Sequence, residues 1–330
     1  MNRLCTGSSL RKLLSSVLLS GLAFTAHAVD RGVNYDPAHS AAYLKAQSNN
    51  NLNGMTSELE ADFAAIQKLG FTNVKTFNAR YGTINGQSAG QIADIACPMG
   101  IKLMLGVFEF RNPQNDCSNW CLTATALDVQ AAISSANDHP GCIVGIAVGN
   151  EDITNWNFTE RHEGMEQRIL ADVKTIKAGL TQAIPVGSAQ QDGALLKLAG
   201  YNDRPSHELI AALDFVGANI YPYWDPQKWT ESAGHAVFRA RYDAVKAKFT
   251  QTIIVTEEGW PSESNPSQNP NASLADEKSY YSWWQSRAGA DTFSSYYFGV
   301  FDKIPSPSDM GADIYFGLCK ANCGKKVLNC

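Results

Sequence analysis

Two glutamates, Glu151 and Glu257, each stand at the end of a short apolar run and are followed by loop-like sequence. The runs cover residues 143–149 and 252–256. A carboxylate at the end of a buried strand costs free energy, because its charge loses contact with water. Two carboxylates from distant parts of a chain are what glycosidic bond cleavage needs, one as the acid and one as the nucleophile. The pair is therefore a candidate catalytic centre.

The elements that would position this pair recur along the chain. Eight short runs rich in β-branched, aromatic or apolar residues are typical of parallel strands buried on both faces. They are residues 32–35, 73–77, 102–108, 143–149, 184–188, 215–220, 252–256 and 296–301. Helical patterns lie between them at residues 57–69, 125–136, 160–180, 235–249 and 275–287. For the first of these helices, Ser57 and Glu60 form a capping box and Gly70 is the expected C-cap.

Eight strand-then-helix units predict an α/β fold, a single (β/α)8 TIM barrel. An open doubly wound sheet is the alternative, but no Gly-x-Gly-x-x-Gly follows the first strand. In the barrel, Glu151 ends the fourth strand and Glu257 the seventh, so both should face the cleft at the carboxyl rim. Adjacent side chains on an extended strand point to opposite sides, so Glu258 should not face it.

Residues 1–28 have the form of a secretory signal peptide, and residues 29–330 form the expected catalytic domain. Arg3, Arg11 and Lys12 precede a short apolar stretch that ends at the cleavage-like Ala26-His27-Ala28. The other interpretation is an amphipathic N-terminal helix. The sequence thus predicts a secreted protein, extracellular or periplasmic, with no membrane span after signal removal and most simply a monomer.

Composition limits the classes of partner and cofactor. The formal charge is −5, and no Lys/Arg run is interleaved with aromatic residues, so nucleic acid is not an expected partner. The histidines are scattered, so no metal and no cofactor are expected. Seven cysteines follow residue 28, which in an exported chain predicts disulfides and at least one cysteine left over. A zinc site is the rival, but there is no Cys-x-x-Cys motif.

Three motifs resemble glycoside hydrolase family 17, the β-1,3-glucanases and β-1,3-glucanosyltransferases. They are Gly149-Asn150-Glu151, Asn219-Ile220-Tyr221-Pro222-Tyr223 and Glu257-Glu258-Gly259-Trp260-Pro261-Ser262. Residues 32–35 and 316–318 are similar to its first strand and closing segment, so the resemblance covers nearly the whole chain after residue 28. It implies a retaining enzyme acting on β-glucan poly- or oligosaccharide, with Glu151 as the acid/base and Glu257 as the nucleophile.

The same resemblance implies that Asn150 hydrogen-bonds the sugar 2-hydroxyl and that Tyr221 holds the Glu257 carboxylate. Aromatic residues near the cleft are expected to stack on sugar rings. The predicted substrate contacts are Tyr35, Phe77, Tyr221, Tyr223 and Trp260. Ordinary core packing is the alternative for the aromatic residues after the sixth and seventh strands. Glu109, after the third strand, is either a third rim carboxylate or a solvated loop charge.

The sequence departs from the family in two places. Phe301-Asp302-Lys303-Ile304-Pro305 replaces the usual Phe-Asp-Glu-Pro-Trp-Lys, so a carboxylate that supports the subsites is absent or comes from elsewhere. Thr76-Phe77-Asn78 stands where Arg-Leu-Tyr or Arg-Thr-Tyr is usual. Hydrolysis is the expected reaction. Transglycosylation by the same two carboxylates is the first alternative, and a catalytically inactive glucan-binding barrel is the second.

Overall fold

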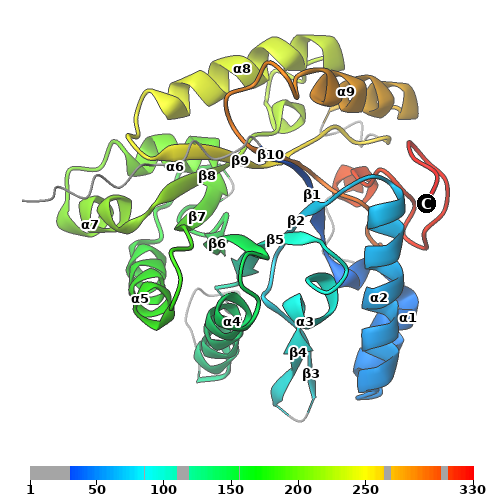
Figure 1. The fold of residues 1–330 in the computed structure, drawn as a ribbon. Coiled ribbons are helices and arrows are strands. Elements are labelled where there is room, and N and C mark those ends of the chain that lie inside the picture. Colours follow the sequence, from blue (N-terminus) through cyan, green and yellow to red (C-terminus); the bar gives the residue numbers. More distant parts are fainter. Residues whose placement is uncertain (1–29, 85, 110–118, 156, 264–268, 306–310) are drawn as a thin grey trace, which may run out of the picture.

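Eight parallel strands close into a barrel with helices around its outside (Figure 1). The computed structural model describes residues 30–84, 86–109, 119–155, 157–263, 269–305 and 311–330. In barrel order the strands are β1 (Arg31–Tyr35), β10 (Ser295–Tyr297), β9 (Thr252–Glu258), β8 (Phe215–Asn219), β7 (Val186–Gln191), β6 (Ile143–Asn150), β5 (Lys102–Val107) and β2 (Asn73–Thr76). The predicted (β/α)8 barrel is confirmed, with strand ends shifted by a few residues. The signal-peptide prediction lies outside the described residues.

The helices follow the strands as predicted, with additional short ones between them. They are α1 (Ala41–Ser48), α2 (Leu52–Lys68), α3 (Ala93–Ala96), α4 (Asn119–Asp138), α5 (Glu163–Gly179), α6 (Asp192–Leu198), α7 (Arg204–Ala212), α8 (Glu231–Lys246) and α9 (Leu274–Ser286). The described segments also contain the 3-10 turns η1 (Pro37–His39), η2 (Pro222–Trp224) and η3 (Gly311–Tyr315).

The predicted start of the first long helix is wrong. Helix α2 begins before Ser57, because the Asn51 side chain accepts a hydrogen bond from the Gly54 N–H and caps the helix there. Ser57 therefore lies inside the helix and caps nothing. The predicted end is confirmed: Gly70 follows the C-cap residue with φ of 90°, a left-handed conformation that glycine adopts without a steric cost.

A two-stranded antiparallel hairpin was not predicted. Strands β3 (Arg80–Ile84) and β4 (Gln87–Gln91) follow β2 and pair with each other, outside the barrel. The hairpin contacts α1, α2 and α4, and it lies between these helices below β2 in Figure 1. It therefore adds a wall at the carboxyl end of β2, next to the rim where the candidate catalytic pair lies.

Two packed regions support the rim. Inside the barrel, side chains from five different strands form one layer: Met104, Ala147, Ala189, Phe215 and Tyr296. A larger cluster fills the space between the strands and the outer helices. Both are close-packed, so the strand ends are held in fixed relative positions.

Within the described part of the chain, disulfides join Cys97 to Cys142 and Cys319 to Cys330, as expected for paired cysteines. Cys121 is also disulfide-bonded, and Cys323 is a free thiol within the part of the chain that the structure describes. This agrees with the predicted leftover cysteine. Among the same residues no helix is both long and apolar enough to cross a membrane.

Candidate active site

The end of β6 bends sharply and presents Glu151 to the cleft. Gly149 has φ of 75°, and a Cβ atom there would lie 2.7 Å from Asp152 Oδ2. Glu151 itself has φ of 55°, which is uncommon for a residue with a side chain and costs free energy. The Asn150 N–H donates to Asp152 Oδ2 at 3.1 Å and stabilises the bend. Strained backbone of this kind is found where a side chain must be aimed.

Two amides from neighbouring strands hold the Glu151 carboxyl. Asn219 Nδ2, at the end of β8, donates to Glu151 Oε1 at 2.9 Å, and Gln191 Nε2, at the end of β7, donates to Oε2 at 3.3 Å. The Thr256 hydroxyl donates to Asn219 Oδ1 at 2.6 Å, so the amide nitrogen of Asn219 must face Glu151. The orientation of this carboxyl is therefore fixed by three strands.

Glu257, in β9, is 4% exposed and has a positive and a neutral partner. Lys75 Nζ lies 3.1 Å from Glu257 Oε1, and the Tyr221 hydroxyl donates to Oε2 at 2.8 Å. Lys75 comes from β2 and is 1% exposed. Burying a charged lysine costs free energy unless an opposite charge compensates it, and in this pair the lysine in turn stabilises negative charge on Glu257.

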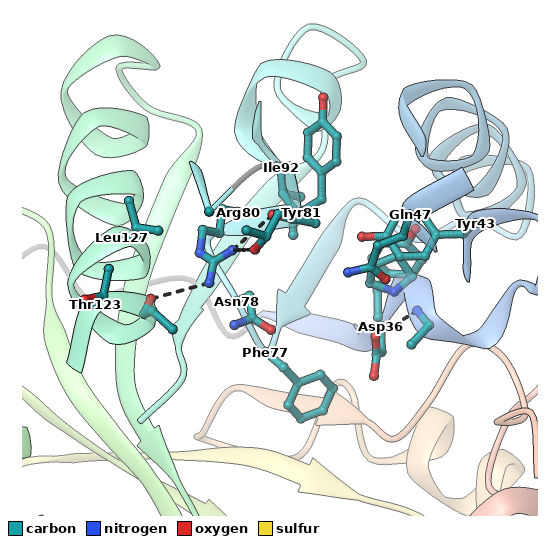
Figure 2. Close-up of a pocket in the computed structure, with 17 residues that line it drawn as sticks. Asp36, Tyr43, Gln47, Phe77, Asn78, Arg80, Tyr81, Ile92, Thr123 and Leu127 are labelled. Carbon is teal, nitrogen blue, oxygen red and sulfur yellow. Dashed lines mark hydrogen bonds between the residues drawn. The ribbon is translucent and has the colours of Figure 1, made fainter. Parts of the chain in front are cut away.

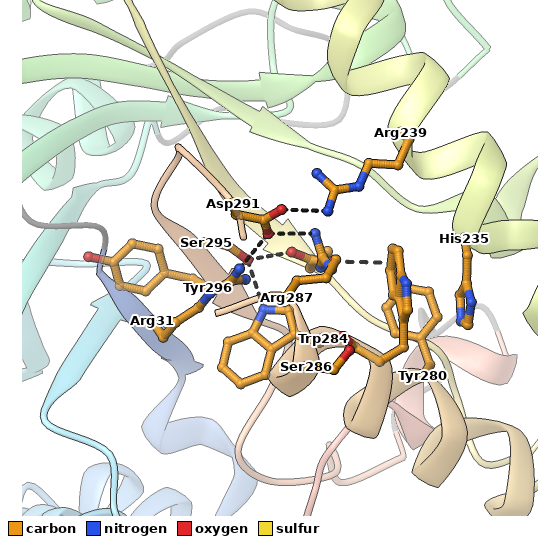
Figure 3. A network of polar contacts seen from close by, with 12 residues as sticks. Arg31, His235, Arg239, Tyr280, Trp284, Ser286, Arg287, Asp291, Ser295 and Tyr296 are labelled. Carbon is orange, nitrogen blue, oxygen red and sulfur yellow. Dashed lines mark hydrogen bonds and ion pairs between the residues drawn. The ribbon is translucent and has the colours of Figure 1, made fainter. Parts of the chain in front are cut away.

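Glu258 points away from the cleft, as predicted from strand alternation. Its carboxylate pairs with Arg287 and with the Ser295 hydroxyl, and the Tyr280 hydroxyl lies 3.5 Å from Oε2. Figure 3 shows this network, in which Arg287 also pairs with Asp291 between the barrel and α9. Glu258 is therefore a buried structural carboxylate, separate from the candidate pair.

The pKa of Glu151 is raised to about 8. Burial is the largest cause, and the negative charge of Glu257 is the second. Lys75 and the Asn219 hydrogen bond oppose the shift. At neutral pH Glu151 therefore keeps its proton beside a carboxylate that is paired with a lysine. Two neighbouring carboxyls with different protonation states can act as an acid and a nucleophile.

The structure brings Asn150 and Tyr221 close to the pair. Asn219 Nδ2 also lies 3.4 Å from Asn150 Oδ1, so Asn150 shares the amide that binds Glu151. Burial and the charges of Glu257 and Glu151 hold the pKa of Tyr221 well above its usual value. Its hydroxyl is therefore a proton donor to Glu257 at any working pH, as the motif implied.

Tyr223 and Trp260 do not form the predicted stacking surface. Both are fully buried, with no exposed area on either ring. The Tyr223 hydroxyl donates to Asn269 O at 3.0 Å, and Trp260 Nε1 donates to Asn271 O at 3.0 Å. The two rings pack edge to face, 5.5 Å apart. Core packing, the alternative interpretation, describes both residues here, because their polar atoms are used to hold the chain after β9.

Tyr35 and Phe77 lie on the side of the cleft next to β1 and β2. Tyr35 is 1% exposed and its hydroxyl donates to Asp62 Oδ2 at 2.8 Å, so that hydroxyl binds α2 rather than the cleft. Phe77 is half-buried, and its ring centroid lies 4.2 Å from Lys75 Nζ. Of the two, Phe77 is the side chain that adjoins the candidate pair.

Sequence reasoning missed Lys75, Gln191 and the role of Asn219. Lys75 interrupts an apolar strand, and such a charge is the same signal that identified Glu151 and Glu257. Asn219 is the first residue of the motif at residues 219–223, but only the register between β8 and β9 places it opposite Glu257. Gln191 carried no sequence signal, because polar residues at strand ends are common.

Two further acidic residues, Asp313 and Glu109, follow barrel strands near the carboxyl rim, and both are paired with a cation. Asp313, in η3, pairs with Lys303, and its charge is among the causes that raise the pKa of Glu151. Asp313 is therefore a carboxylate close enough to the candidate pair to influence it, although it lies in a different segment from position 303. Glu109 is 2% exposed and pairs with Arg168 at 2.8 Å, so it is not a solvated loop charge. Burial is the main reason that its pKa rises to about 9.

No cluster of three His, Cys, Asp or Glu side chains placed to hold a metal ion occurs among the described residues.

Residues 32–317 match the family model described as the BtgE/BtgC glycoside hydrolase domain. A probable β-glucosidase of Aspergillus flavus is 26% identical over 62% of this chain and 30% of its own length. A probable family 17 glucosidase of Saccharomyces cerevisiae is 22% identical over 88% of this chain and 65% of its own length. The chain thus spans less than two thirds of these curated relatives.

Solved structures show the same fold at low sequence identity. An endo-laminarinase from Formosa has a TM-score of 0.70 and 17% identity, covering 89% of this chain and 84% of its own. A family 17 β-1,3-glucanosyltransferase from Rhizomucor miehei has a TM-score of 0.63 and 19% identity, covering 90% and 95%.

Proposed function

The chain belongs to the BtgE/BtgC glycoside hydrolase family, and we propose that it cleaves β-1,3-linked glucan with retention of anomeric configuration. The resemblance to family 17 is confirmed by this match and by relatives carrying that family's name, and the chain is an O-glycosyl hydrolase. The substrate class follows the printed descriptions of relatives, which include a probable glucan endo-1,3-β-glucosidase of Aspergillus oryzae.

One observation carries the proposed mechanism. Glu151 has a pKa raised to about 8, while the adjacent Glu257 is paired with Lys75 and Tyr221. A protonated carboxyl next to a stabilised carboxylate is the division of roles that double displacement requires.

In the first step, Glu257 attacks the anomeric carbon while the glycosidic C–O bond breaks. The leaving oxygen takes the proton of Glu151, which gives a glycosyl ester on Glu257 and a Glu151 carboxylate. In the second step, Glu151 removes a proton from water, and the water oxygen attacks the anomeric carbon and releases Glu257. Asn219 and Gln191 keep the Glu151 carboxyl in one orientation through both steps.

The same intermediate can be released by a sugar hydroxyl in place of water, which makes the reaction a glucanosyl transfer. Incubation with a laminari-oligosaccharide of one length distinguishes the two outcomes. Hydrolysis gives only shorter products, whereas transfer also gives products longer than the substrate.

The test of the residue roles compares Glu257→Gln and Glu151→Gln with the wild type. Each substitution should lower kcat by about 10² to 10⁴-fold or more. Glu151→Gln has no acidic proton to give to the leaving oxygen, and Glu257→Gln has no carboxylate to form the bond to the anomeric carbon. Glu258→Gln is not a useful control, because it breaks a buried ion pair. Glu208→Gln, on α7, is the matched control: its ion pair with Arg204 lies at the surface and contributes little, so this variant should keep wild-type activity.

Adding azide separates the two roles. Azide should restore turnover of Glu151→Ala on an activated aryl glucoside and give a β-glucosyl azide. Equal turnover of laminari-oligosaccharide by wild type and Glu257→Gln would remove the nucleophile assignment.

A further inference from the structure

Cavities lie near both ends of the strand order, beside β2 and after β10. The cavity on the β2 side measures about 710 Å³ and includes Phe77, a predicted substrate contact, so it belongs to the site already described (Figure 2). The cavity after β10 measures about 590 Å³. Part of its lining comes from residues 319–330, here called the tail. The tail follows residue 317, at which the match to the family model ends.

The tail is a closed ring of chain attached to the end of the barrel. The Cys319 N–H donates to Val300 O at 2.8 Å, and the Asp302 N–H donates to Cys319 O at 2.8 Å. The disulfide from Cys319 to Cys330 closes the ring. Lys326 lies within this ring, so the disulfide limits how far its backbone can move away from the barrel.

The Lys326 ammonium is buried among oxygens from three segments. Its Nζ lies 3.2 Å from Glu277 Oε1 in α9, 2.6 Å from Asp302 Oδ1, 2.9 Å from Tyr315 O and 2.7 Å from Gly317 O. The Lys326 side chain is 6% exposed. An ammonium group has three N–H donors, so these oxygens use all of its hydrogen-bonding capacity. The lysine therefore ties α9, the end of β10 and η3 together at one point.

The two carbonyls that bind Lys326 flank Phe316, which leads to the proposed nucleophile. The Phe316 ring is 1% exposed and packs edge to face on Tyr221, with the ring centroids 5.5 Å apart. The Tyr221 hydroxyl donates to Glu257 Oε2 at 2.8 Å. Because the backbone is held on both sides of Phe316, its ring has one position against Tyr221.

The same lysine fixes the turn whose charge acts on the proposed acid. Tyr315 is the last residue of η3, and its carbonyl accepts from the Ser262 N–H at 2.9 Å as well as from Lys326. Asp313, in the same turn, is among the causes that raise the pKa of Glu151. A displaced η3 would therefore change the protonation of Glu151.

We propose that Lys326 is a positioning residue for the reaction at the catalytic pair. Its ammonium fixes the backbone on both sides of Phe316, which seats that ring against Tyr221 and keeps Asp313 within electrostatic reach of Glu151. Lys326 acts through these groups rather than on the sugar. The inference rests on the proposed function, because it gives Lys326 a part in that reaction.

The first experiment compares Lys326→Ala with Lys325→Ala, which removes the exposed neighbouring lysine and is the matched control. Burial raises the pKa of Glu277 to about 8, and Lys326 opposes that shift. Without Lys326 the Glu277 carboxyl takes up a proton, so it leaves no uncompensated charge and the variant should fold. kcat and KM for laminari-oligosaccharides are measured across the pH range with each protein.

In Lys326→Ala, kcat should fall about tenfold or more with a smaller change in KM, because the catalytic groups are misplaced. The alkaline limb of the pH profile should move to lower pH, because Asp313 no longer raises the pKa of Glu151. The loss of a positive charge by itself would raise that pKa, so a downward shift reports the displaced turn. Lys325→Ala should behave as the wild type. Wild-type kcat in Lys326→Ala, or equal losses in both variants, overturns the inference.

The second experiment restores the missing ammonium to Lys326→Ala. Propylammonium matches the atoms that the substitution removes, and the cavity of about 590 Å³ lined by Lys326 gives it a route to the oxygens. It should recover part of kcat and move the alkaline limb back. Tetramethylammonium has the same charge but no N–H donor and should restore neither. A loss of kcat that propylammonium does not reverse, with the limb at the wild-type pH, would mean that Lys326 serves stability alone.

Two further measurements keep the inference open to refutation. If Lys326→Ala does not fold, Phe316→Leu decides, because it leaves the lysine in place and removes the ring from Tyr221. Its kcat should also fall about tenfold, and wild-type kcat overturns the inference. A carboxyl-carbon NMR titration of Glu151 needs no turnover. If the wild type cleaves no laminari-oligosaccharide, the proposed function fails, whereas a lower Glu151 pKa in Lys326→Ala still supports the positioning role and an unchanged one contradicts it.

Discussion

At the scale of single residues, the proton on Glu151 is the feature on which the proposed chemistry depends. Burial and the charge of Glu257 raise the pKa of Glu151 to about 8, well above the usual value of a glutamic acid. The acid form is therefore the resting form at neutral pH. Lys75 and Tyr221 meanwhile bind both oxygens of Glu257.

The pH dependence of the wild type tests this assignment. In the proposed mechanism Glu151 must hold its proton, so kcat/KM should fall as the pH rises through about 8. In Glu257→Gln the charge that raises this pKa is lost, so Glu151 should titrate at a lower pH. A carboxyl-carbon NMR titration of both proteins measures it. An unchanged Glu151 pKa in Glu257→Gln would mean that the two carboxyls do not interact.

Lys75 is predicted to act through Glu257. Lys75→Met removes the positive partner of the carboxylate, and kcat should fall by about 10²-fold. The charge of Lys75 also lowers the pKa of Glu151, so the alkaline limb of the pH profile should move upward in this variant. Lys75→Arg keeps the charge and should recover part of the activity. If Lys75→Met loses activity but the alkaline limb of its pH profile stays at the wild-type pH, the loss would come from a packing defect instead.

At the scale of elements, the bend at the end of β6 decides where Glu151 points. Gly149→Ala puts a methyl group 2.7 Å from Asp152 Oδ2 at a φ of 75°. We expect a lower Tm, a stability loss of about 1–2 kcal/mol and reduced kcat, because the acid is displaced. Gly145→Ala is the matched control on the same strand, since the nearest atoms would lie 3.6–3.7 Å from its new Cβ, which is ordinary van der Waals contact. Equal effects of both substitutions would contradict this role of the bend.

The barrel elements were predictable and the hairpin was not, for a physical reason. Parallel strands covered on both faces need continuous apolar runs, and residues 143–149 and 252–256 show them directly. The hairpin residues 80–91 are mostly polar or small, and Tyr81 and Ile84 are the large apolar side chains among them, so they form no such run. The Asn85-Gly86 pair was the available turn signal in the sequence. The start of α2 was misplaced because Asn51 competed with a capping box that fits equally well.

At the scale of the whole molecule, disulfides join distant parts of the chain. Cys97–Cys142 links residues 45 positions apart, between α3 and the start of β6. Reduction should lower the Tm, and Cys97→Ser with Cys142→Ser should cost about 2–4 kcal/mol. The free thiol supplies the control, because Cys323→Ser breaks no bond and should leave the Tm near that of the wild type. A Tm unchanged by reduction would contradict a stabilising role.

We propose that the chain is exported, because its N-terminal residues have signal-peptide form and its cysteines are paired. Processing after Ala28 is the expected outcome. N-terminal sequencing of protein recovered from outside the cytoplasm measures it. A chain that retains Met1 there would contradict the assignment.

The sequence by itself determined the barrel, because strand runs are local patterns that burial imposes on a chain, and its motifs determined the family. Its strand-end charges also singled out the two glutamates as candidates. Only the tertiary structure decided which groups surround those glutamates. Lys75, Asn219 and Glu257 are far apart in the chain and meet because barrel closure brings β2, β8 and β9 to one rim. The same closure buried Tyr223 and Trp260, since packing between strands and helices depends on neighbours that no single segment specifies.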